Sequence, residues 1–361
     1  MGAFPEDASP FSARFRTKNQ EPRTKNQEPR TKNQERGRRA QAACASPVLA
    51  EIPFPLMSDL TQRLSLSTCW NSHRHEDGYA MLAEIRELGF HRAELSHGVR
   101  LELAPGILRA VDEGLVAISS VHNFCPLPGS VRHPAPNLFQ PSARSKKERA
   151  LWLLHSRRTL EFAARVGAPH VVMHSGSVSF RFFNPEPVLE ADPAAPALIR
   201  EKALARLRKG ATKAMRHLLV SYTALAPEVW KQGLVLGIEN REGILELPLD
   251  DGFPAFFEAF PSDTPLGYWH DTGHARIKHL GGLLDHETHL ASLADRLIGF
   301  HLHDVDEQHR DHRPPGTGSV DFAMIARYVR PHHTLVFEPH PSLSVEEIRR
   351  SQMFLLDTLA P

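Results

Sequence analysis

From Arg63 onward, short apolar stretches of strand type alternate with stretches of helical type. Apolar residues recur at helical spacing between the strands, as at Ile85 and Leu88. The last helix begins with a capping box formed by Ser344 and Glu347. The candidate strands are residues 63–70, 92–97, 116–124, 170–176, 234–240, 266–271, 297–304 and 334–340. Eight strands with helices between them predict an α/β fold, namely a parallel (β/α)8 TIM barrel.

The structural alternative is an open, doubly wound sheet. Such a sheet normally carries a glycine-rich phosphate loop after its first strand, and residues 67–73, STCWNSH, contain no glycine. The sequence also lacks a P-loop, a GxSxG motif and a zinc-ribbon cysteine pattern. The barrel is therefore the favoured fold.

Several helices are predicted between these strands. A long insertion, residues 177–233, combines a proline-rich loop with a basic helix around 198–225. Between the sixth and seventh strands, Leu290, Leu293 and Leu297 share one face of a predicted helix. The remaining predicted helices are residues 77–90, 104–113, 146–166 and 320–329.

A polar repeat precedes the alternating region. RTKNQEP occurs at 16–22 and 23–29, and RTKNQER follows at 30–36. No position of this seven-residue unit is apolar and two copies contain proline, which excludes a coiled coil. We predict a disordered tail over residues 1–56 and one domain over 57–361. The alternatives are a weak nucleic-acid or partner tail, and a translation start at Met57 that mass spectrometry of the native N-terminus would reveal.

Charge and cysteine content limit the classes of partner. Residues 1–56 contain 10 Lys and Arg against 6 Asp and Glu, whereas the remaining residues contain 33 against 36. The mildly acidic domain argues against nucleic acid as the main partner. No apolar run is long enough to span a membrane. Cys44, Cys69 and Cys125 lie far apart, which fits a reducing cytoplasm, so we expect a cytoplasmic protein.

Polar and ionisable residues occupy the ends of nearly all the predicted strands. They are Glu94, His97, His122, His174, Glu239, Asp271, His274, His301, His303, Asp304, Glu338 and His340. Each histidine alone fits a hydrogen-bonded rim residue. In a parallel barrel, however, the carboxyl ends of all strands meet at one mouth, where such acidic groups would repel one another without a cation. The joint pattern predicts a divalent metal site.

Four motifs resemble the xylose isomerase-like TIM barrels, and the resemblance covers residues 63–358. The motifs are GIEN, HDTGH, FHLHD followed by RPPGTGSVDF, and FEP. That superfamily includes sugar isomerases and epimerases, inosose dehydratases and the endonuclease IV group, which is the AP endonuclease family 2 branch. The motifs are specific for the superfamily and weak for the substrate.

The resemblance implies particular residues. In the epimerase branch, the metal ligands fall on Glu239, Asp271, His303 and Glu338, and His274 contacts the substrate. The endonuclease branch uses three zinc ions and adds histidines that resemble His122, His174 and His312. The chain departs from both patterns in one loop. Arg310 stands where the endonucleases have an aspartate, and it lies one residue later than the substrate-binding arginine of the epimerases.

The resulting hypothesis is a divalent-metal-dependent sugar isomerase or epimerase that acts by enediolate proton transfer on a ketose-like or inosose-like substrate. Glu239 and Glu338 would exchange the proton on opposite faces, while His274 and Arg310 would hold hydroxyl groups. The oxygen-rich ligand set suits Mn²⁺, Mg²⁺ or Co²⁺, and Zn²⁺ if the additional histidines are ligands.

Two other functions remain open. One is an endonuclease IV-like zinc phosphodiesterase, which accounts better for the additional histidines. The other is a non-catalytic sugar-binding barrel, against which the presence of both Glu239 and Glu338 speaks. The 177–233 insertion either covers the site or forms the contact of a homo-oligomer.

Overall fold

The structure is a computed structural model that describes residues 60–129, 131–190 and 196–360. The predicted disordered tail, residues 1–56, and the alternative start at Met57 lie outside these ranges. Among the described helices, none combines the length and the apolar character that crossing a bilayer requires.

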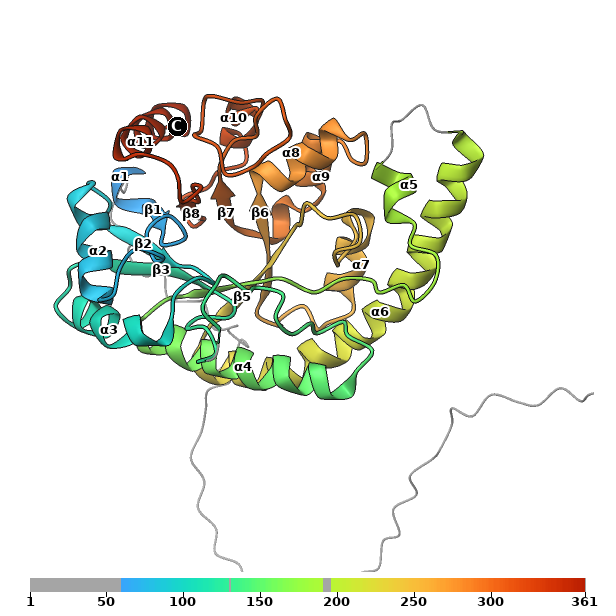
Figure 1. Cartoon of the computed structure of the whole chain (residues 1–361), viewed down its shortest axis with the longest axis horizontal. Helices are drawn as coiled ribbons and strands as arrows, with labels where there is room; N and C mark the ends of the chain where they lie inside the picture. Colours follow the sequence, from blue (N-terminus) through green and yellow to red (C-terminus); the bar gives the residue numbers. More distant parts are fainter. Residues whose placement is uncertain (1–59, 130, 191–195, 361) are drawn as a thin grey trace, which may run out of the picture. The chain divides into compact units, whose positions relative to one another are not determined.

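Eight parallel strands close into a barrel in which each strand pairs with its neighbours in chain order and β8 pairs with β1 (Figure 1). The strands are β1 Leu64–Ser67, β2 Arg92–Leu95, β3 Ala117–His122, β4 His170–Met173, β5 Val235–Glu239, β6 Leu266–Asp271, β7 Leu297–Leu302 and β8 Thr334–Phe337. Every predicted strand is present, and the predicted (β/α)8 barrel is confirmed.

Helices lie between the strands. The first group is α1 Leu60–Arg63, α2 Gly78–Glu87, α3 Ala104–Asp112, α4 Lys146–Arg165, α5 Glu186–Glu190 and α6 Ala197–Gln232. The second group is α7 Phe253–Glu258, α8 Thr272–Leu280, α9 His286–Ser292, α10 Phe322–Ala326 and α11 Val345–Thr358. Single 3₁₀ turns occupy Leu101–Leu103, Asp250–Gly252 and Ala294–Arg296.

Local sequence explains where the long helices begin and end. The Ser145 hydroxyl accepts a hydrogen bond from the Glu148 amide at the start of α4. Gly233, at a φ of 67°, ends α6 in the left-handed conformation that favours glycine. The predicted capping box of Ser344 and Glu347 opens α11.

Two predicted helices differ from those observed. The helix expected to carry Leu290, Leu293 and Leu297 is divided, because α8 ends at Gly281 and Asp285 caps α9 through the Thr288 amide. Leu297 belongs to β7 rather than to the helix.

The basic helix of the 177–233 region is longer than predicted and fills the regular place between β4 and β5. Tyr222 of α6 packs against Trp152 of α4 with ring centroids 5.4 Å apart, and the Ser221 hydroxyl donates to the Pro141 carbonyl at 2.8 Å. The region is therefore a complete barrel helix with an extension, next to which α5 lies (Figure 1).

The barrel interior is filled by one large ring. Trp269 of β6 is fully buried and packs with Val172 and Val336 from other strands. Gly237 and Gly299 face this indole, and a β-carbon at Gly237 would come within 2.8 Å of it. Both glycines therefore allow the ring to occupy the barrel centre, beneath the polar groups at the carboxyl ends of the strands.

Candidate metal centre

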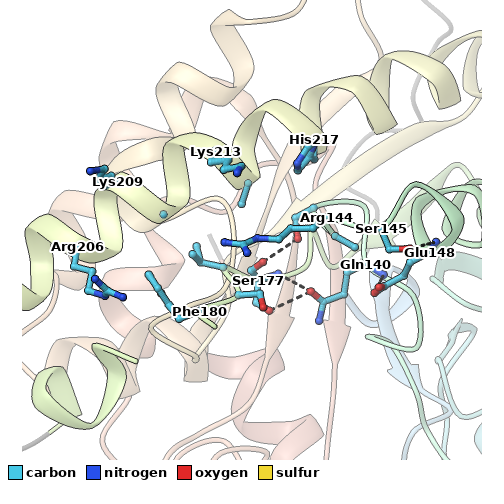
Figure 2. A pocket seen from close by; sticks show the side chains of 16 residues that line it. Gln140, Arg144, Ser145, Glu148, Ser177, Phe180, Arg206, Lys209, Lys213 and His217 are labelled. Atoms are coloured by element: carbon cyan, nitrogen blue, oxygen red, sulfur yellow. Dashed lines mark hydrogen bonds between the residues drawn. The ribbon is translucent and has the colours of Figure 1, made fainter. Parts of the chain in front are cut away.

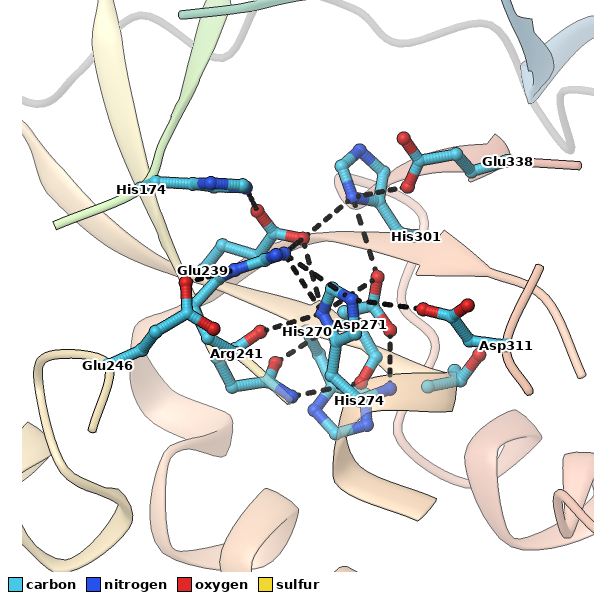
Figure 3. Close-up of polar contacts among 12 residues, drawn as sticks. His174, Glu239, Arg241, Glu246, His270, Asp271, His274, His301, Asp311 and Glu338 are labelled. Atoms are coloured by element: carbon cyan, nitrogen blue, oxygen red, sulfur yellow. Dashed lines mark hydrogen bonds and ion pairs between the residues drawn. The ribbon is translucent and has the colours of Figure 1, made fainter. Parts of the chain in front are cut away.

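Three carboxylates and one imidazole meet at the carboxyl ends of β5 to β8. Glu239 ends β5, Asp271 ends β6, His301 lies near the end of β7, and Glu338 directly follows β8. The Nδ1 atom of His301 lies 3.2 Å from Glu239 Oε1, 3.8 Å from Asp271 Oδ2 and 3.0 Å from Glu338 Oε2. All four residues are at most 3% exposed (Figure 3). These four residues are called the central cluster below.

Charge compensation in the central cluster requires a cation. Burial alone would lower the pKa of His301, but the carboxylates of Glu338 and Glu94 raise it well above its usual range. Burial alone would likewise raise the pKa of Glu338, which the neighbouring His301 holds well below its usual range. The carboxylates therefore favour positive charge at this point, whether a proton on the imidazole or a divalent ion that competes with it.

A second group of imidazoles surrounds the other oxygen of Glu239. His174 Nε2 lies 2.9 Å and His122 Nε2 3.5 Å from Glu239 Oε2. Within the described residues this oxygen has no partner in hydrogen-bond geometry despite its burial, and neither has Nδ1 of the adjacent His97. Burial lowers the pKa of His174 to about 4, so its imidazole is neutral and able to bind a metal.

A third group lies on the far side of Asp271. His303 Nε2 and His274 Nδ1 lie 2.9 Å and 3.2 Å from Asp271 Oδ2. His312 stacks on His303 with ring centroids 4.2 Å apart, and its Nε2 lies 3.7 Å from Glu338 Oε2. These residues therefore form a continuous polar surface with the central cluster.

The structure places His301 and His303 at different positions in the site. Because residues two apart along a strand point the same way, the pattern FHLHD predicts that both side chains lie on one face, and both are fully buried. His301, however, contacts all three carboxylates of the central cluster, whereas His303 contacts Asp271 and faces His312. By position, His301 completes the central cluster that the sequence motif assigned to His303; the ligand role of each histidine stays a prediction.

Arg310 is not brought to the site. Its guanidinium pairs with Asp306 at 2.8 Å and its side chain is 61% exposed. The guanidinium that does reach the site belongs to Arg241, which directly follows the GIEN motif. Arg241 Nη1 lies 3.2 Å from Glu239 Oε1 and 3.1 Å from His274 Nδ1 (Figure 3). In the sequence, its position directly after the end of a predicted strand was the one feature that indicated a place of Arg241 in the site.

Arg241 is tied firmly to its carboxylate neighbours. Burial opposes the charge of the guanidinium, but Glu239, Glu246 and Asp271 outweigh it and raise the pKa of Arg241. Arg241 Nε also lies 3.3 Å from Glu246 Oε1. The arginine therefore stays charged and holds the pKa of Glu239 well below its usual range, against the effect of burial and together with His174.

Backbone contacts orient Asp271. The Asn240 side chain accepts a hydrogen bond from the Asp271 amide at 2.7 Å and donates one to the Asp271 carbonyl at 3.0 Å. Tyr268 donates a further bond to the same Asn240 oxygen. Asp271 Oδ1 caps α8 by accepting from the His274 amide, which leaves Oδ2 directed at the histidines.

Asp304 orients the loop that carries Asp311 and His312. Its two carboxylate oxygens accept hydrogen bonds from four backbone amides, those of Val305, Gly316, Gly318 and Val320. Asp311, which sequence reasoning did not assign, lies 3.1 Å from His312 Nδ1 and 3.5 Å from His274 Nε2. The loop thus reaches the barrel mouth in a defined position.

The residues present fit a divalent ion. Three carboxylates from separate strands lie around one imidazole, and a buried carboxylate oxygen lacks a hydrogen bond. Oxygen-rich sets with one nitrogen suit Mn²⁺, Mg²⁺ or Co²⁺, and the flanking histidine groups suit Zn²⁺. Ligand atoms of His122, His174 and Glu239 lie close enough to share an ion, as do those of Asp271, His274 and His303.

Comparisons with known proteins agree with this fold. A family model described as xylose isomerase-like TIM barrel matches residues 82–350. A comparison with curated proteins found no match. Among solved structures, 3-keto-D-glucoside 4-epimerase from E. coli is 15% identical, with a TM-score of 0.59 over 81% of this chain and 98% of that chain.

Two further solved structures have similar sequence identities, coverages and TM-scores. D-psicose 3-epimerase from Clostridium cellulolyticum, solved with D-tagatose, is 11% identical, with a TM-score of 0.58 over 82% of this chain and 99% of that one. A putative xylose isomerase from Rhodospirillum rubrum is 16% identical, with a TM-score of 0.59 over 82% and 98%. At these identities the likeness shows a shared fold.

Proposed function

The chain belongs to the xylose isomerase-like TIM barrel family, and from that premise we propose that it is a divalent-metal-dependent isomerase or epimerase. Its substrate would be a ketose-like or inosose-like sugar. The observation that carries the proposal is the central cluster, in which Glu239, Asp271, His301 and Glu338 converge from four strands. The sugar epimerases among the structural neighbours support the same class of reaction.

In this proposal, the four residues of the central cluster hold Mn²⁺, Mg²⁺ or Co²⁺. When bound, such an ion supplies Lewis-acid polarisation of a carbonyl and a neighbouring hydroxyl oxygen of the sugar. The adjacent C–H becomes more acidic as a result, so a carboxylate can remove its proton. His122, His174 and His312 would bind only if a further ion, most naturally Zn²⁺, is present.

Glu239 and Glu338 are the residues proposed to move the proton. They approach His301 from opposite sides (Figure 3). One carboxylate takes the proton from carbon and leaves an enediolate, and the other, in its acid form, returns a proton to the opposite face. Low pKa values keep both carboxylates ionised at neutral pH, so either can accept the proton from carbon. The carboxylate that returns a proton to the opposite face therefore first takes one up from solvent.

Arg241 and His274 are proposed to orient the sugar. Both lie beside Glu239, and each carries N–H groups suited to hydroxyl oxygens. Arg241 takes the place in this proposal that the sequence had suggested for Arg310. Its charge also compensates Glu239, so substrate binding and carboxylate ionisation are linked through one side chain.

A second candidate function is a zinc phosphodiesterase. The specific observation in its favour is that histidine groups flank the central cluster on two sides and share its carboxylates. Glu239 contacts His122 and His174, while Asp271 contacts His274 and His303. An arrangement of several adjacent ions would suit hydrolysis of a phosphodiester.

One experiment separates the two candidates. The chelated protein is reloaded with Mn²⁺, Co²⁺ or Zn²⁺ and incubated in D₂O with a panel of ketoses and inososes, and deuterium incorporation beside the carbonyl is followed by ¹H NMR. The proposal expects metal-dependent exchange with at least one sugar, lost in Glu239→Gln. Absence of exchange across the panel, together with Zn²⁺-dependent nicking of an abasic duplex, would replace it by the phosphodiesterase.

A further inference from the structure

A cavity of about 760 Å³ lies outside the candidate metal centre. Its walls are the segment leading into α4, the loop after β4, and the first half of α6 (Figure 2). None of its lining residues belongs to the central cluster or to the two histidine groups. A volume of this size suits a small molecule.

The lining is strongly cationic. Arg206, Lys209 and Lys213 of α6 are spaced by three and four residues and so share one face of the helix. Arg144 lies opposite them, just before α4 (Figure 2). The carboxylate in the lining is Glu148, whose Oε1 accepts from the Gln140 amide. Four cations against one carboxylate leave an excess of positive charge.

These cations are not neutralised by ion pairs. Within the described ranges, Arg144, Lys209 and Lys213 have no carboxylate within 4.0 Å, and Arg206 donates to the Phe183 carbonyl rather than to an acid. By contrast, Arg208 and Lys231 on the same helix pair with Asp251 and Glu228. The four cations that line the cavity therefore all lack a carboxylate partner among the described residues.

The surroundings of the cavity show the same positive potential. Slight burial and the neighbouring cations Arg149, Lys213 and Arg144 lower the pKa of His217, which also lines the cavity. The first turn of the twenty-residue α4 adds its partial positive charge at the same wall. Side-chain hydroxyls of Ser142, Ser145, Ser177 and Ser179 complete the polar lining.

The wall is held in place by packing. Gly210 of α6 faces Val178 and Phe180, and a β-carbon there would come within 2.7 Å of Val178. The loop after β4 can therefore approach the helix closely. Ser177 donates from its amide and its hydroxyl to Gln140 Oε1, at 3.1 Å each, which joins the loop to the α4 wall.

We propose that this cavity is a binding site for a phosphate group, either free or carried by a small phosphorylated metabolite. Lysine and arginine side chains from two elements match a dianion. The Ser145 hydroxyl, which only accepts a hydrogen bond from the Glu148 amide, and the Ser179 hydroxyl can donate to its oxygens. The anion site is independent of the proposed isomerase activity. It is joined to the metal centre through the loop after β4, in which Ser177 follows His174 by three residues, and through Asn137, whose side chain contacts His174 at 3.3 Å three residues before Gln140.

The test uses the full chain in EDTA at physiological ionic strength, so its outcome does not depend on metal or turnover. Inorganic phosphate is titrated by calorimetry into the unmodified protein, into the double variant Lys209→Gln/Lys213→Gln, and into the matched double variant Lys202→Gln/Lys231→Gln. Both variants remove two exposed lysines from α6, but only the first changes the cavity.

We expect saturable phosphate binding that weakens by about tenfold or more in the cavity variant and by less than about twofold in the matched variant. Absence of saturable binding, or equal weakening in both variants, would overturn the proposal. D-Fructose 6-phosphate and D-fructose identify the source of the phosphate. Tighter binding of the phosphorylated sugar than of inorganic phosphate indicates a metabolite, and equal binding of the two phosphates indicates free phosphate.

Discussion

His301 Nε2 lies 3.0 Å from Glu94 Oε2, beneath the candidate metal centre, and both side chains are fully buried. Glu94 also accepts hydrogen bonds from the hydroxyls of Ser67, at 3.0 Å, and Ser120, at 2.8 Å. With Nε2 bonded to this carboxylate, Nδ1 is the imidazole atom that faces Glu239 and Glu338. Glu94 therefore sets which nitrogen of His301 is offered to a metal ion.

The first prediction concerns Glu94→Gln. An amide in this position cannot accept from both serines and the imidazole at once, so the ring loses its fixed orientation. We expect Mn²⁺ and Co²⁺ affinity to fall by about 10- to 100-fold, measured by calorimetry on the chelated protein. Ser120→Ala is the control, since it keeps the carboxylate and should change affinity by less than about threefold. Unchanged affinity in Glu94→Gln would remove Glu94 from this role.

The second prediction compares His301→Gln with His303→Gln. If His301 completes the central cluster, its replacement should weaken binding of the first ion by on the order of 100-fold or more, because a ligand is lost. His303→Gln should weaken it by less than about tenfold, because that imidazole contacts only Asp271 among the three carboxylates. Calorimetric titration with Mn²⁺ measures both. The opposite ranking would return the ligand role to His303.

His301 and His303 also show which features of the site can be predicted from the sequence and which cannot. Alternation in FHLHD predicts that both face inward, and the motif places them at the barrel mouth. Which one lies among the carboxylates depends on how β7 pairs with its neighbours, where a shift occurs between Tyr268 and Trp269 of β6. That register comes from packing in the closed barrel rather than from local pattern.

The other residues of the site could be predicted from the sequence to different degrees. Glu239, Asp271 and Glu338 end apolar strands, and a charge in that position indicates a compensating partner. Arg241 has no comparable pattern, because an arginine after a strand is ordinary in any loop. The end of the helix before β7 was missed because the spacing of Leu290, Leu293 and Leu297 continues past the last residue of α9, Ser292, into β7.

The third prediction compares two arginines. Arg241→Gln removes the guanidinium that lies beside Glu239 and His274, so the pKa of Glu239 should rise and turnover of an identified sugar should fall by about 100-fold or more. Arg310→Gln is the matched control, with an effect below about threefold, because its side chain faces solvent and pairs with Asp306. Steady-state kinetics measures both. Similar losses in the two variants would contradict the assignment.

The fourth prediction concerns pH and His170, which lies at the opposite end of β4 from His174 and hydrogen-bonds with Thr334. Burial lowers the pKa of His170 to about 4 from its ordinary value of 6.5. Between these values the unfolded chain binds the extra proton and the folded chain does not, so the stability present above pH 6.5 declines as the pH falls towards 4.

The measurement is urea unfolding at pH 7 and pH 5. The contribution of His170 to the loss of unfolding free energy is about 2 kcal/mol, and His170→Gln should reduce the loss by that amount. His133→Gln, an exposed histidine variant, should leave the pH dependence unchanged. A His170 variant that loses as much stability as the unmodified protein between the two pH values would contradict the expectation.

The fifth prediction concerns Asp304→Asn. The carboxylate accepts from the amides of Val305, Gly316, Gly318 and Val320, and asparagine has only one acceptor oxygen for these four donors. We expect a loss of about 2–3 kcal/mol in unfolding free energy and new proteolytic cleavage within residues 306–319. Asp306→Asn is the comparison in the same loop, because Asp306 pairs with Arg310 and Arg313 and accepts from two backbone amides rather than four, so its loss should be smaller. If Asp304 positions His312 and Asp311, the variant should also lose more affinity for a second ion than for the first. Equal losses for the two ions would mean that the loop supports the whole mouth rather than its outer half.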